Sequence, residues 1–244
     1  MQNIYDKEVF FDEYKSMREK PINANNLIEI PAMKKLLPFL KGKRVLDLGC
    51  GMGEMTKYYS KLGASFVLGV DISQNMLDIA NKTNKLDNIE YKLLPLEEID
   101  KINDKFDVVI SSLAFHYIQD YNKLIKDIYN LLNNDGILLF SQENPIGTCF
   151  VSQNKIANKL DIEGKRYYLV SDYNNNGLRK NDWNDCAVEK YHRNFTVTIN
   201  TLIFNKFTLL EIQEPVASKE AIELEPKYKN QFDRPYFLII KCKK

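Results

Sequence analysis

The feature that most constrains the fold is a glycine-rich loop between a short apolar run and a helical pattern. Residues 45–48 are mostly apolar, and glycines follow at Gly49, Gly51 and Gly53. Apolar side chains then recur at helical spacing over residues 55–62. Glycine has no Cβ, so the backbone of such a loop turns sharply and approaches a ligand closely. A strand, a glycine-rich turn and a helix in this order are typical of the first unit of a nucleotide-binding α/β sheet.

The spacing of the loop distinguishes nucleotides with phosphates from nucleosides without them. A dinucleotide-binding loop has its third glycine at the position where this chain carries Glu54. A negative charge there opposes the binding of a pyrophosphate, which the helix dipole otherwise attracts. The next apolar run, residues 66–71, ends in Asp71, where a carboxylate can accept hydrogen bonds from ribose hydroxyls. The pattern therefore favours a nucleoside with free ribose hydroxyls and no phosphate.

Residues 45–53 and 70–77 closely resemble the class I S-adenosylmethionine-dependent methyltransferases, and the resemblance covers residues 40–145. It implies a Rossmann-like α/β fold with S-adenosyl-L-methionine as the cofactor and S-adenosyl-L-homocysteine as its product. It also implies a set of cofactor-binding residues at the strand ends. These are Asp47, Gly49, Cys50, Gly51, Gly53, Asp71, Ile72, Met76, Leu96, Glu97, Ser111 and His116. Pro95 and Leu96 stand where the family usually has a polar residue beside the adenine, so the exocyclic amine is left to the backbone or to Glu97.

Alternating strands and helices predict a doubly wound, mainly parallel, seven-stranded sheet. Apolar runs predict strands over 45–48, 66–71, 89–93, 106–110, 137–140, 208–212 and 236–240. Helical periodicity predicts helices over 26–40, 73–80, 120–132 and 195–206, with Ser73 and Asp120 as N-caps. By resemblance, the last two strands form an antiparallel pair at one edge of the sheet.

The chain divides into three parts. They are residues 1–40, residues 41–145 together with 194–244, and residues 146–193. The first part is predicted to be helical, either packed on the domain or closing over the cofactor as a lid. The second is the Rossmann-like domain, and the third is a small β-rich insertion after the fifth strand that covers the substrate. Within the insertion, residues 166–170 predict a strand and residues 174–177 predict a hairpin turn.

Composition excludes several classes of function. The formal net charge is +1, so no strong field attracts the chain to nucleic acid or to an anionic membrane. The four cysteines lie far apart and form no Cys-x-x-Cys pair, which predicts reduced thiols in a cytoplasmic protein and no metal site. No apolar run is long enough for a membrane span, and Asp6, Lys7 and Glu8 interrupt the region where a signal peptide is apolar.

Three side chains are candidates for the acid–base or substrate-positioning steps of catalysis: His116, Glu143 and His192. His116 follows the fourth strand, and it is either a general base or a structural histidine at the head of the next helix. Glu143 ends the fifth strand, where it could position the substrate or take a proton. His192 lies between Tyr191 and Arg193 where the insertion returns to the sheet, as part of a substrate-recognition patch or of a surface turn.

These observations predict methyl transfer by in-line displacement to an O, N or C nucleophile of a small-molecule acceptor. A sulfonium donor is already activated, so the protein mainly aligns and desolvates the reactants. One alternative is a module that binds the cofactor without turnover. The other is a nicotinamide-dependent oxidoreductase, which Glu54 argues against. The identity of the acceptor and the oligomeric state stay open.

Overall fold

The fold is built on one large sheet whose strands match the predicted apolar runs. The computed structural model describes residues 3, 5–6, 8–151, 159–183 and 186–244. Its large sheet contains β1 (Arg44–Leu48), β2 (Phe66–Asp71), β3 (Ile89–Leu93), β4 (Phe106–Ser112), β5 (Leu132–Glu143), β10 (Thr208–Gln213) and β11 (Phe237–Lys243). The strand order is β10-β11-β5-β4-β1-β2-β3. Only β11 runs against its neighbours β5 and β10, so the predicted mainly parallel sheet with an antiparallel pair at one edge is confirmed.

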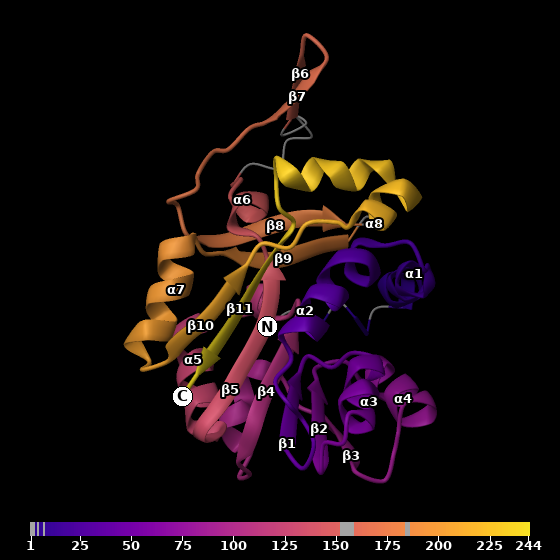
Figure 1. Ribbon diagram of the computed structural model, residues 1–244, viewed down its shortest axis with the longest axis vertical. Coiled ribbons are helices and arrows are strands. Elements are labelled where there is room, and N and C mark those ends of the chain that lie inside the picture. Colours follow the sequence, from indigo (N-terminus) through magenta and orange to yellow (C-terminus); the bar gives the residue numbers. More distant parts are fainter. Residues whose placement is uncertain (1–2, 4, 7, 152–158, 184–185) are drawn as a thin grey trace.

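Helices cover both faces of this sheet (Figure 1). The α-helices are α1 (Glu8–Glu19), α2 (Ile30–Leu36), α3 (Glu54–Lys61), α4 (Gln74–Thr83), α5 (Tyr121–Leu131), α6 (Pro145–Thr148), α7 (Phe195–Phe204) and α8 (Lys219–Leu224). A π-helical turn, η1 (Asn25–Glu29), precedes α2, and 3₁₀ turns form η2 (Leu96–Lys101), η3 (Phe115–Tyr117) and η4 (Pro226–Phe232). The predicted caps are present, since Ser73 Oγ accepts the Met76 N–H and Asp120 Oδ1 accepts the Lys123 N–H.

Alternation along the central strands divides the apolar side chains between two cores. Leu46 and Leu48 of β1 pack in a cluster that includes the buried face of α5, whereas Val45 packs on the opposite side with residues of α2 and α3. A strand buried on both faces reads as a continuous apolar run, which is why β1 and β4 were recognisable in the sequence. Because β1, β2 and β4 are parallel, their carboxyl ends meet at one edge, next to the point where the strand order reverses.

The insertion after β5 forms two separate hairpins. Strand β6 (Lys159–Ile162) pairs with β7 (Lys165–Tyr168), and β8 (Gly177–Trp183) pairs with β9 (Cys186–His192). The predicted β-rich insertion is thus confirmed, but the hairpin turn predicted at 174–177 is wrong, because β7 and β8 belong to different sheets. The β6–β7 hairpin extends away from the large sheet at the top of Figure 1, while β8–β9 lies across the carboxyl edge of the large sheet.

None of the helices in the described ranges is both long and apolar enough to cross a lipid bilayer. Cys50, Cys149 and Cys242 are free thiols. Within the same part of the chain, no cluster of His, Cys, Asp and Glu has the arrangement of a metal site.

Candidate active site

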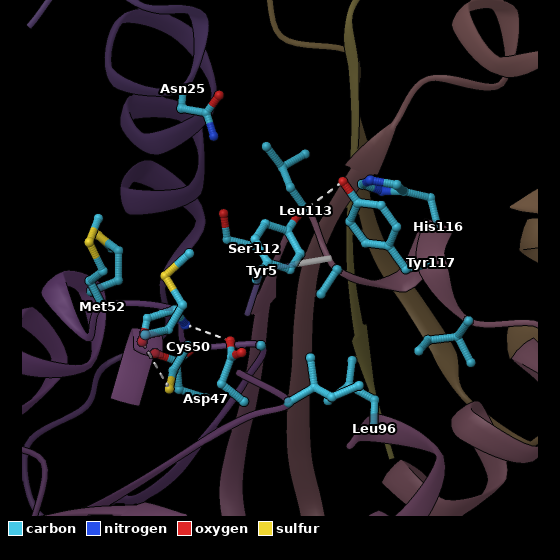
Figure 2. Close-up of a pocket in the computed structure, with 18 of the residues that line it drawn as sticks. Tyr5, Asn25, Asp47, Cys50, Met52, Leu96, Ser112, Leu113, His116 and Tyr117 are labelled. Atoms are coloured by element: carbon cyan, nitrogen blue, oxygen red, sulfur yellow. Dashed lines mark hydrogen bonds between the residues drawn. The ribbon is translucent and has the colours of Figure 1, made fainter. Parts of the chain in front are cut away.

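A cavity of about 350 Å³ opens at the carboxyl ends of β1, β2, β4 and β5. All but two of the residues expected at the site line it: Asp47, Gly49, Cys50, Gly51, Gly53, Asp71, Ile72, Met76, Leu96, Glu97, His116 and Glu143. Figure 2 shows Asp47 and Cys50 on one side of this space and His116 and Tyr117 on the other. Ligands of open α/β sheets bind in such a crevice at the reversal of the strand order.

Asp71 is held in place by the loop that it faces. Its Oδ2 accepts the Gly51 N–H at 2.8 Å, and its Oδ1 accepts the Ser73 N–H at 2.9 Å. Burial raises the pKa of Asp71, while these backbone hydrogen bonds favour the ionised form and act in the opposite direction. Each carboxylate oxygen has a second lone pair, so the side chain can still accept hydrogen bonds from a pair of ligand hydroxyls.

The three glycines of the loop are required for different structural reasons. A Cβ at Gly49 would lie 2.7 Å from Ala114 Cβ, and one at Gly53 would lie 2.3 Å from Tyr91 Oη, so both positions must stay small for the protein's own packing. Gly51 has φ +52°, and a Cβ there would meet nothing within 4 Å. Gly51 is therefore the glycine whose bare backbone leaves room for a ligand, and its N–H also orients Asp71.

Asp47 is the second carboxyl group at this end of the cavity. It is buried, and its Oδ2 accepts the Thr56 hydroxyl at 2.6 Å. Burial raises the pKa of Asp47 to about 7, and the negative charge of Asp71 adds to this shift. The Thr56 contact ties the end of β1 to α3, so Asp47 orders the loop as well as lining the cavity.

The structure does not bring Ser111 and His192 to the cavity. The Ser111 hydroxyl is fully buried and donates to the Leu48 carbonyl at 2.8 Å. His192 is buried in the insertion, where Nδ1 lies 2.8 Å from the Thr148 hydroxyl and Nε2 lies 2.9 Å from the Tyr173 carbonyl. Side chains alternate along β4, so the neighbouring residue, Ser112, lines the cavity where Ser111 was expected.

His116 and Glu143 meet at the opposite end of the cavity. His116 Nδ1 accepts the Glu143 N–H at 3.4 Å, which assigns the ring proton to Nε2. Burial lowers the pKa of His116 to about 4, so the imidazole is neutral at pH 7. The Glu143 carboxylate accepts a hydrogen bond from Lys190 of β9 at 2.5 Å. Burial opposes ionisation of Glu143, yet His116 and Lys190 keep its pKa below the ordinary value.

The insertion is fixed to this end by Arg193. Its guanidinium donates to the Ile118 carbonyl at 2.8 Å and to the Phe115 carbonyl at 2.5 Å, on either side of the turn that carries His116. Tyr191, two residues earlier, lines the cavity. Arg193 is therefore a support of the site and not part of its lining, unlike the patch expected from the sequence.

Residues near the N-terminus also line the cavity: Tyr5, Met17, Arg18 and Asn25. The sequence patterns did not assign them to the site, although a lid was one interpretation of residues 1–40. Asp6 accepts the Ser73 hydroxyl at 2.5 Å and the Asn75 N–H at 3.2 Å, so this segment contacts the start of α4 beside Asp71. The Tyr5 hydroxyl lies 3.2 Å from that of Tyr117. The only signal in the sequence was the aromatic and basic character of the segment.

Comparisons with known proteins agree with this geometry. A family model described as "Methyltransferase domain" matches residues 46–140. The crystal structure of an S-adenosylmethionine-dependent methyltransferase from Mesorhizobium loti superposes with a TM-score of 0.82 at 32% identity, covering 91% of this chain and 98% of that one. This chain belongs to the S-adenosylmethionine-dependent methyltransferases. It is an enzyme of that family, and its cofactor is S-adenosyl-L-methionine.

Two curated relatives extend the comparison. An uncharacterized protein of Haemophilus influenzae is 36% identical over 99% of this chain and 97% of its own length. A malonyl-[acyl-carrier protein] O-methyltransferase of Bacillus cereus is 30% identical over 134 residues, which are 54% of this chain and 48% of that one. The match to the enzyme of known activity thus spans about half of each chain.

Proposed function

We propose that this methyltransferase transfers a methyl group by in-line displacement to an O, N or C nucleophile of a small-molecule acceptor. Support comes from the two ends of the cavity: the first resembles a nucleoside site around Asp71 and Gly51, and the second combines His116, Glu143 and Tyr191. The cofactor supplies a methyl group on a sulfonium, which needs no metal and no covalent nucleophile for activation.

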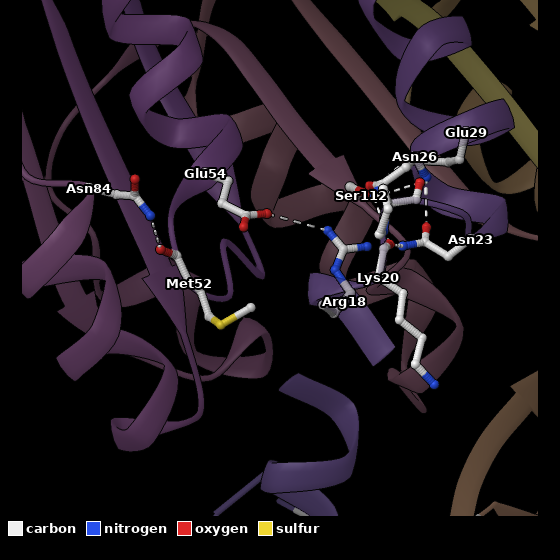
Figure 3. A network of polar contacts seen from close by, with 10 residues as sticks. Arg18, Lys20, Asn23, Asn26, Glu29, Met52, Glu54, Asn84 and Ser112 are labelled. Atoms are coloured by element: carbon white, nitrogen blue, oxygen red, sulfur yellow. Dashed lines mark hydrogen bonds and ion pairs between the residues drawn. The ribbon is translucent and has the colours of Figure 1, made fainter. Parts of the chain in front are cut away.

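The cofactor would be held along the strand ends. Asp71 accepts hydrogen bonds from the ribose hydroxyls, and Ile72, Met76 and Leu96 pack against the adenine. Arg18 is the only arginine or lysine among the described residues of the cavity lining. Its Nη2 lies 3.8 Å from Oε2 of Glu54 at the start of α3 (Figure 3). We assign to Arg18 the carboxylate of the cofactor's amino-acid end.

Among the described residues at the other end of the cavity, none is a strong base at neutral pH. The lowered pKa of His116 makes its imidazole a weak base, and its Nε2–H is a hydrogen-bond donor. Glu143 shares its carboxylate with Lys190. We therefore propose that His116 and Glu143 orient the acceptor, and that the acceptor is a nucleophile that is already deprotonated when it attacks, such as a carboxylate, an acidic hydroxyl or a neutral amine.

Residues 1–40 are proposed to act as a lid. The contacts of Asp6 with the start of α4 and of Tyr5 with Tyr117 join the segment to both ends of the cavity. Such a cover would exclude water from the reacting groups and keep the acceptor and the cofactor aligned.

The test is an assay of S-adenosyl-L-homocysteine release with a panel of small molecules that contain carboxylates, acidic hydroxyls or amines. We expect turnover with at least one class and loss of that turnover in Asp71→Ala. Tight cofactor binding without turnover across the whole panel would contradict the small-molecule assignment. Turnover only with an acceptor attached to a carrier protein would contradict it too, while leaving the methyltransferase activity in place.

A further inference from the structure

A buried carboxyl group, that of Glu29, does not line the cavity itself but contacts Ser112, which does. Glu29 of η1 is fully buried, and its Oε1 accepts a hydrogen bond from Ser112 Oγ at 2.8 Å (Figure 3). The same oxygen accepts a hydrogen bond from Ser141 Oγ at 2.5 Å. Its Oε2 has no hydrogen-bond partner in the part of the chain that the structure describes. Burying a carboxyl group with one oxygen unpaired destabilises the folded protein, so we expect Glu29 to have a role in function.

The hydrogen bond to Glu29 determines what Ser112 offers to a ligand. A serine hydroxyl has one proton, and Ser112 gives its proton to Glu29. Ser112 lines the cavity, and in Figure 2 its hydroxyl points toward the end that Asn25 lines. Only the lone pairs of this oxygen remain for a ligand. Ser112 is therefore a hydrogen-bond acceptor in the cavity and not a donor.

Ser141 is oriented by the same carboxyl group and fixes the next residue of the wall. With its proton given to Glu29, Ser141 Oγ accepts the N–H of Leu113 at 3.1 Å, and the Ser141 backbone carbonyl accepts the same N–H at 3.1 Å. Leu113 lines the cavity and has φ +55°, a left-handed conformation that is uncommon outside glycine. Glu29 thus orients Ser112 directly, and through Ser141 it supports one of the two hydrogen bonds that the Leu113 N–H makes.

The strand order locates this wall relative to the ligand. Asp71 ends β2, Gly49 follows β1, Ser112 ends β4 and Glu143 ends β5, and these strands are neighbours in the order β2-β1-β4-β5. A cofactor held by its ribose at Asp71, with its methyl group toward Glu143, would lie beside Ser112. The amino-acid end of this cofactor carries an ammonium group, which is a hydrogen-bond donor that matches an acceptor-only hydroxyl.

We propose that Glu29 is a positioning residue for the amino-acid end of the cofactor, and that it acts by orienting Ser112 and, through Ser141, Leu113. This inference rests on the proposed cofactor site. It assigns to Glu29 a contribution to binding that depends on the amino-acid end of the ligand and not on the adenosine.

The test is calorimetric titration with two ligands, S-adenosyl-L-homocysteine and 5′-methylthioadenosine. The second has the adenine, ribose and thioether of the first but lacks the amino-acid end. Glu29→Met removes the acceptor at similar size. This variant should bind S-adenosyl-L-homocysteine about tenfold more weakly than wild type, and its affinity for 5′-methylthioadenosine should change less than about twofold. Glu29→Gln keeps an oxygen acceptor and should restore S-adenosyl-L-homocysteine affinity to within about threefold of wild type.

The two ligands and the two variants distinguish a role of Glu29 in positioning the amino-acid end of the cofactor from a role in protein stability alone. Equal weakening of both ligands, or unchanged S-adenosyl-L-homocysteine affinity, in Glu29→Met contradicts the proposal. A Glu29→Gln protein as weak as Glu29→Met also contradicts it, because binding would then depend on the charge of Glu29, which interacts with that of Arg18, and not on its oxygen as a hydrogen-bond acceptor. Should Glu29→Met not fold, Ser112→Ala must show the same split between the ligands. Wild-type protein that binds neither ligand would instead refute the proposed cofactor site.

Discussion

The two ends of the cavity differ in how far apart along the chain their residues lie. Most of the adenosine end comes from residues 47–53 and 71–76, which are the last residues of β1 and β2 and the turns after them, and Leu96 adds to it from the turn after β3. The acceptor end combines Tyr5, His116, Glu143 and Tyr191, which come from four distant segments. Backbone hydrogen bonds hold the first end, such as the Gly49 and Cys50 N–H groups on the Val70 carbonyl. Side-chain contacts hold the second.

This difference indicates which changes each end tolerates. A site made from strand ends depends on the sheet, and its ligand contacts can be changed one by one. A site made from packed segments depends on polar contacts between those segments, such as the partly buried contact of Lys190 with Glu143 and the buried contact of Arg193 with the Phe115 carbonyl. Loss of one such contact leaves a buried partner unsatisfied, so stability and specificity change together.

The largest expected effect tests whether the adenosine end depends on one side chain. Asp71→Ala removes the carboxylate that we propose accepts hydrogen bonds from two ribose hydroxyls, and S-adenosyl-L-homocysteine affinity should fall about 100-fold in calorimetric titration. Asp78→Ala is the control, because Asp78 is an exposed acid on α4. Equal affinities of the two variants would remove the basis for the nucleoside site.

The next effect concerns the buried imidazole at the acceptor end. Between pH 7 and pH 5 the unfolded chain protonates His116 with an ordinary pKa, whereas burial lowers the folded pKa to about 4. The unfolded state therefore binds the proton first, and this group alone should lower the free energy of unfolding by about 2 kcal/mol as the pH falls over that range.

Urea unfolding of wild type and His116→Gln at both pH values measures this term. Carboxyl groups with raised pKa, such as Asp47, act with the opposite sign, but they are present in both proteins and cancel in the difference. Wild type should lose about 2 kcal/mol more than the variant. The same loss of unfolding free energy in both proteins would mean that His116 is protonated as easily in the folded as in the unfolded protein, and that water reaches the acceptor end of the cavity.

A third prediction asks whether the N-terminal segment belongs to the cofactor end. Arg18→Met keeps much of the side-chain length but removes the charge, and it should weaken S-adenosyl-L-homocysteine binding about tenfold. Binding of 5′-methylthioadenosine, which has no carboxylate, should not change. Lys20→Met, at an exposed position, is the control. A loss for both ligands would assign Arg18 to the shape of the lid and not to the carboxylate.

The smallest effect separates two adjacent serines of β4. Ser111→Ala leaves the Leu48 carbonyl without its side-chain donor, so the free energy of unfolding should fall by about 1 kcal/mol. S-adenosyl-L-homocysteine affinity should stay within about twofold of wild type, because Ser111 does not line the cavity. A marked loss of affinity would show that the wall of the cavity depends on Ser111 as well as on Ser112.

Much of the fold could be predicted, because parallel strands buried on both faces are continuous apolar runs. The boundaries were less certain. Strand β5 begins at Leu132, well before the predicted 137–140, since its polar start at Asn133 to Gly136 has no strand signal. The turn at 174–177 was misread because asparagines and glycine favour a turn locally, whereas pairing with β9 determines where β8 begins.

The candidate site divides in the same way. The placement of Asp71 beside the loop could be anticipated, because the ends of neighbouring parallel strands meet at one edge. Ser111 was expected at the site and Ser112 lines the cavity instead, because the sequence does not state which face of β4 turns toward the cavity. Glu29 and Arg18 gave no usable signal, since each owes its position to contacts with residues far away in the chain.

By itself the sequence determined the sheet, the glycine loop and a nucleoside ligand without phosphates, because these depend on local periodicity and on residues near one another in the chain. Only the tertiary structure decided that His116 is neutral, that Ser112 gives its proton to Glu29 and that residues near the N-terminus line the cavity. Burial and hydrogen-bond direction depend on every segment packed around a group, and no local pattern carries that information.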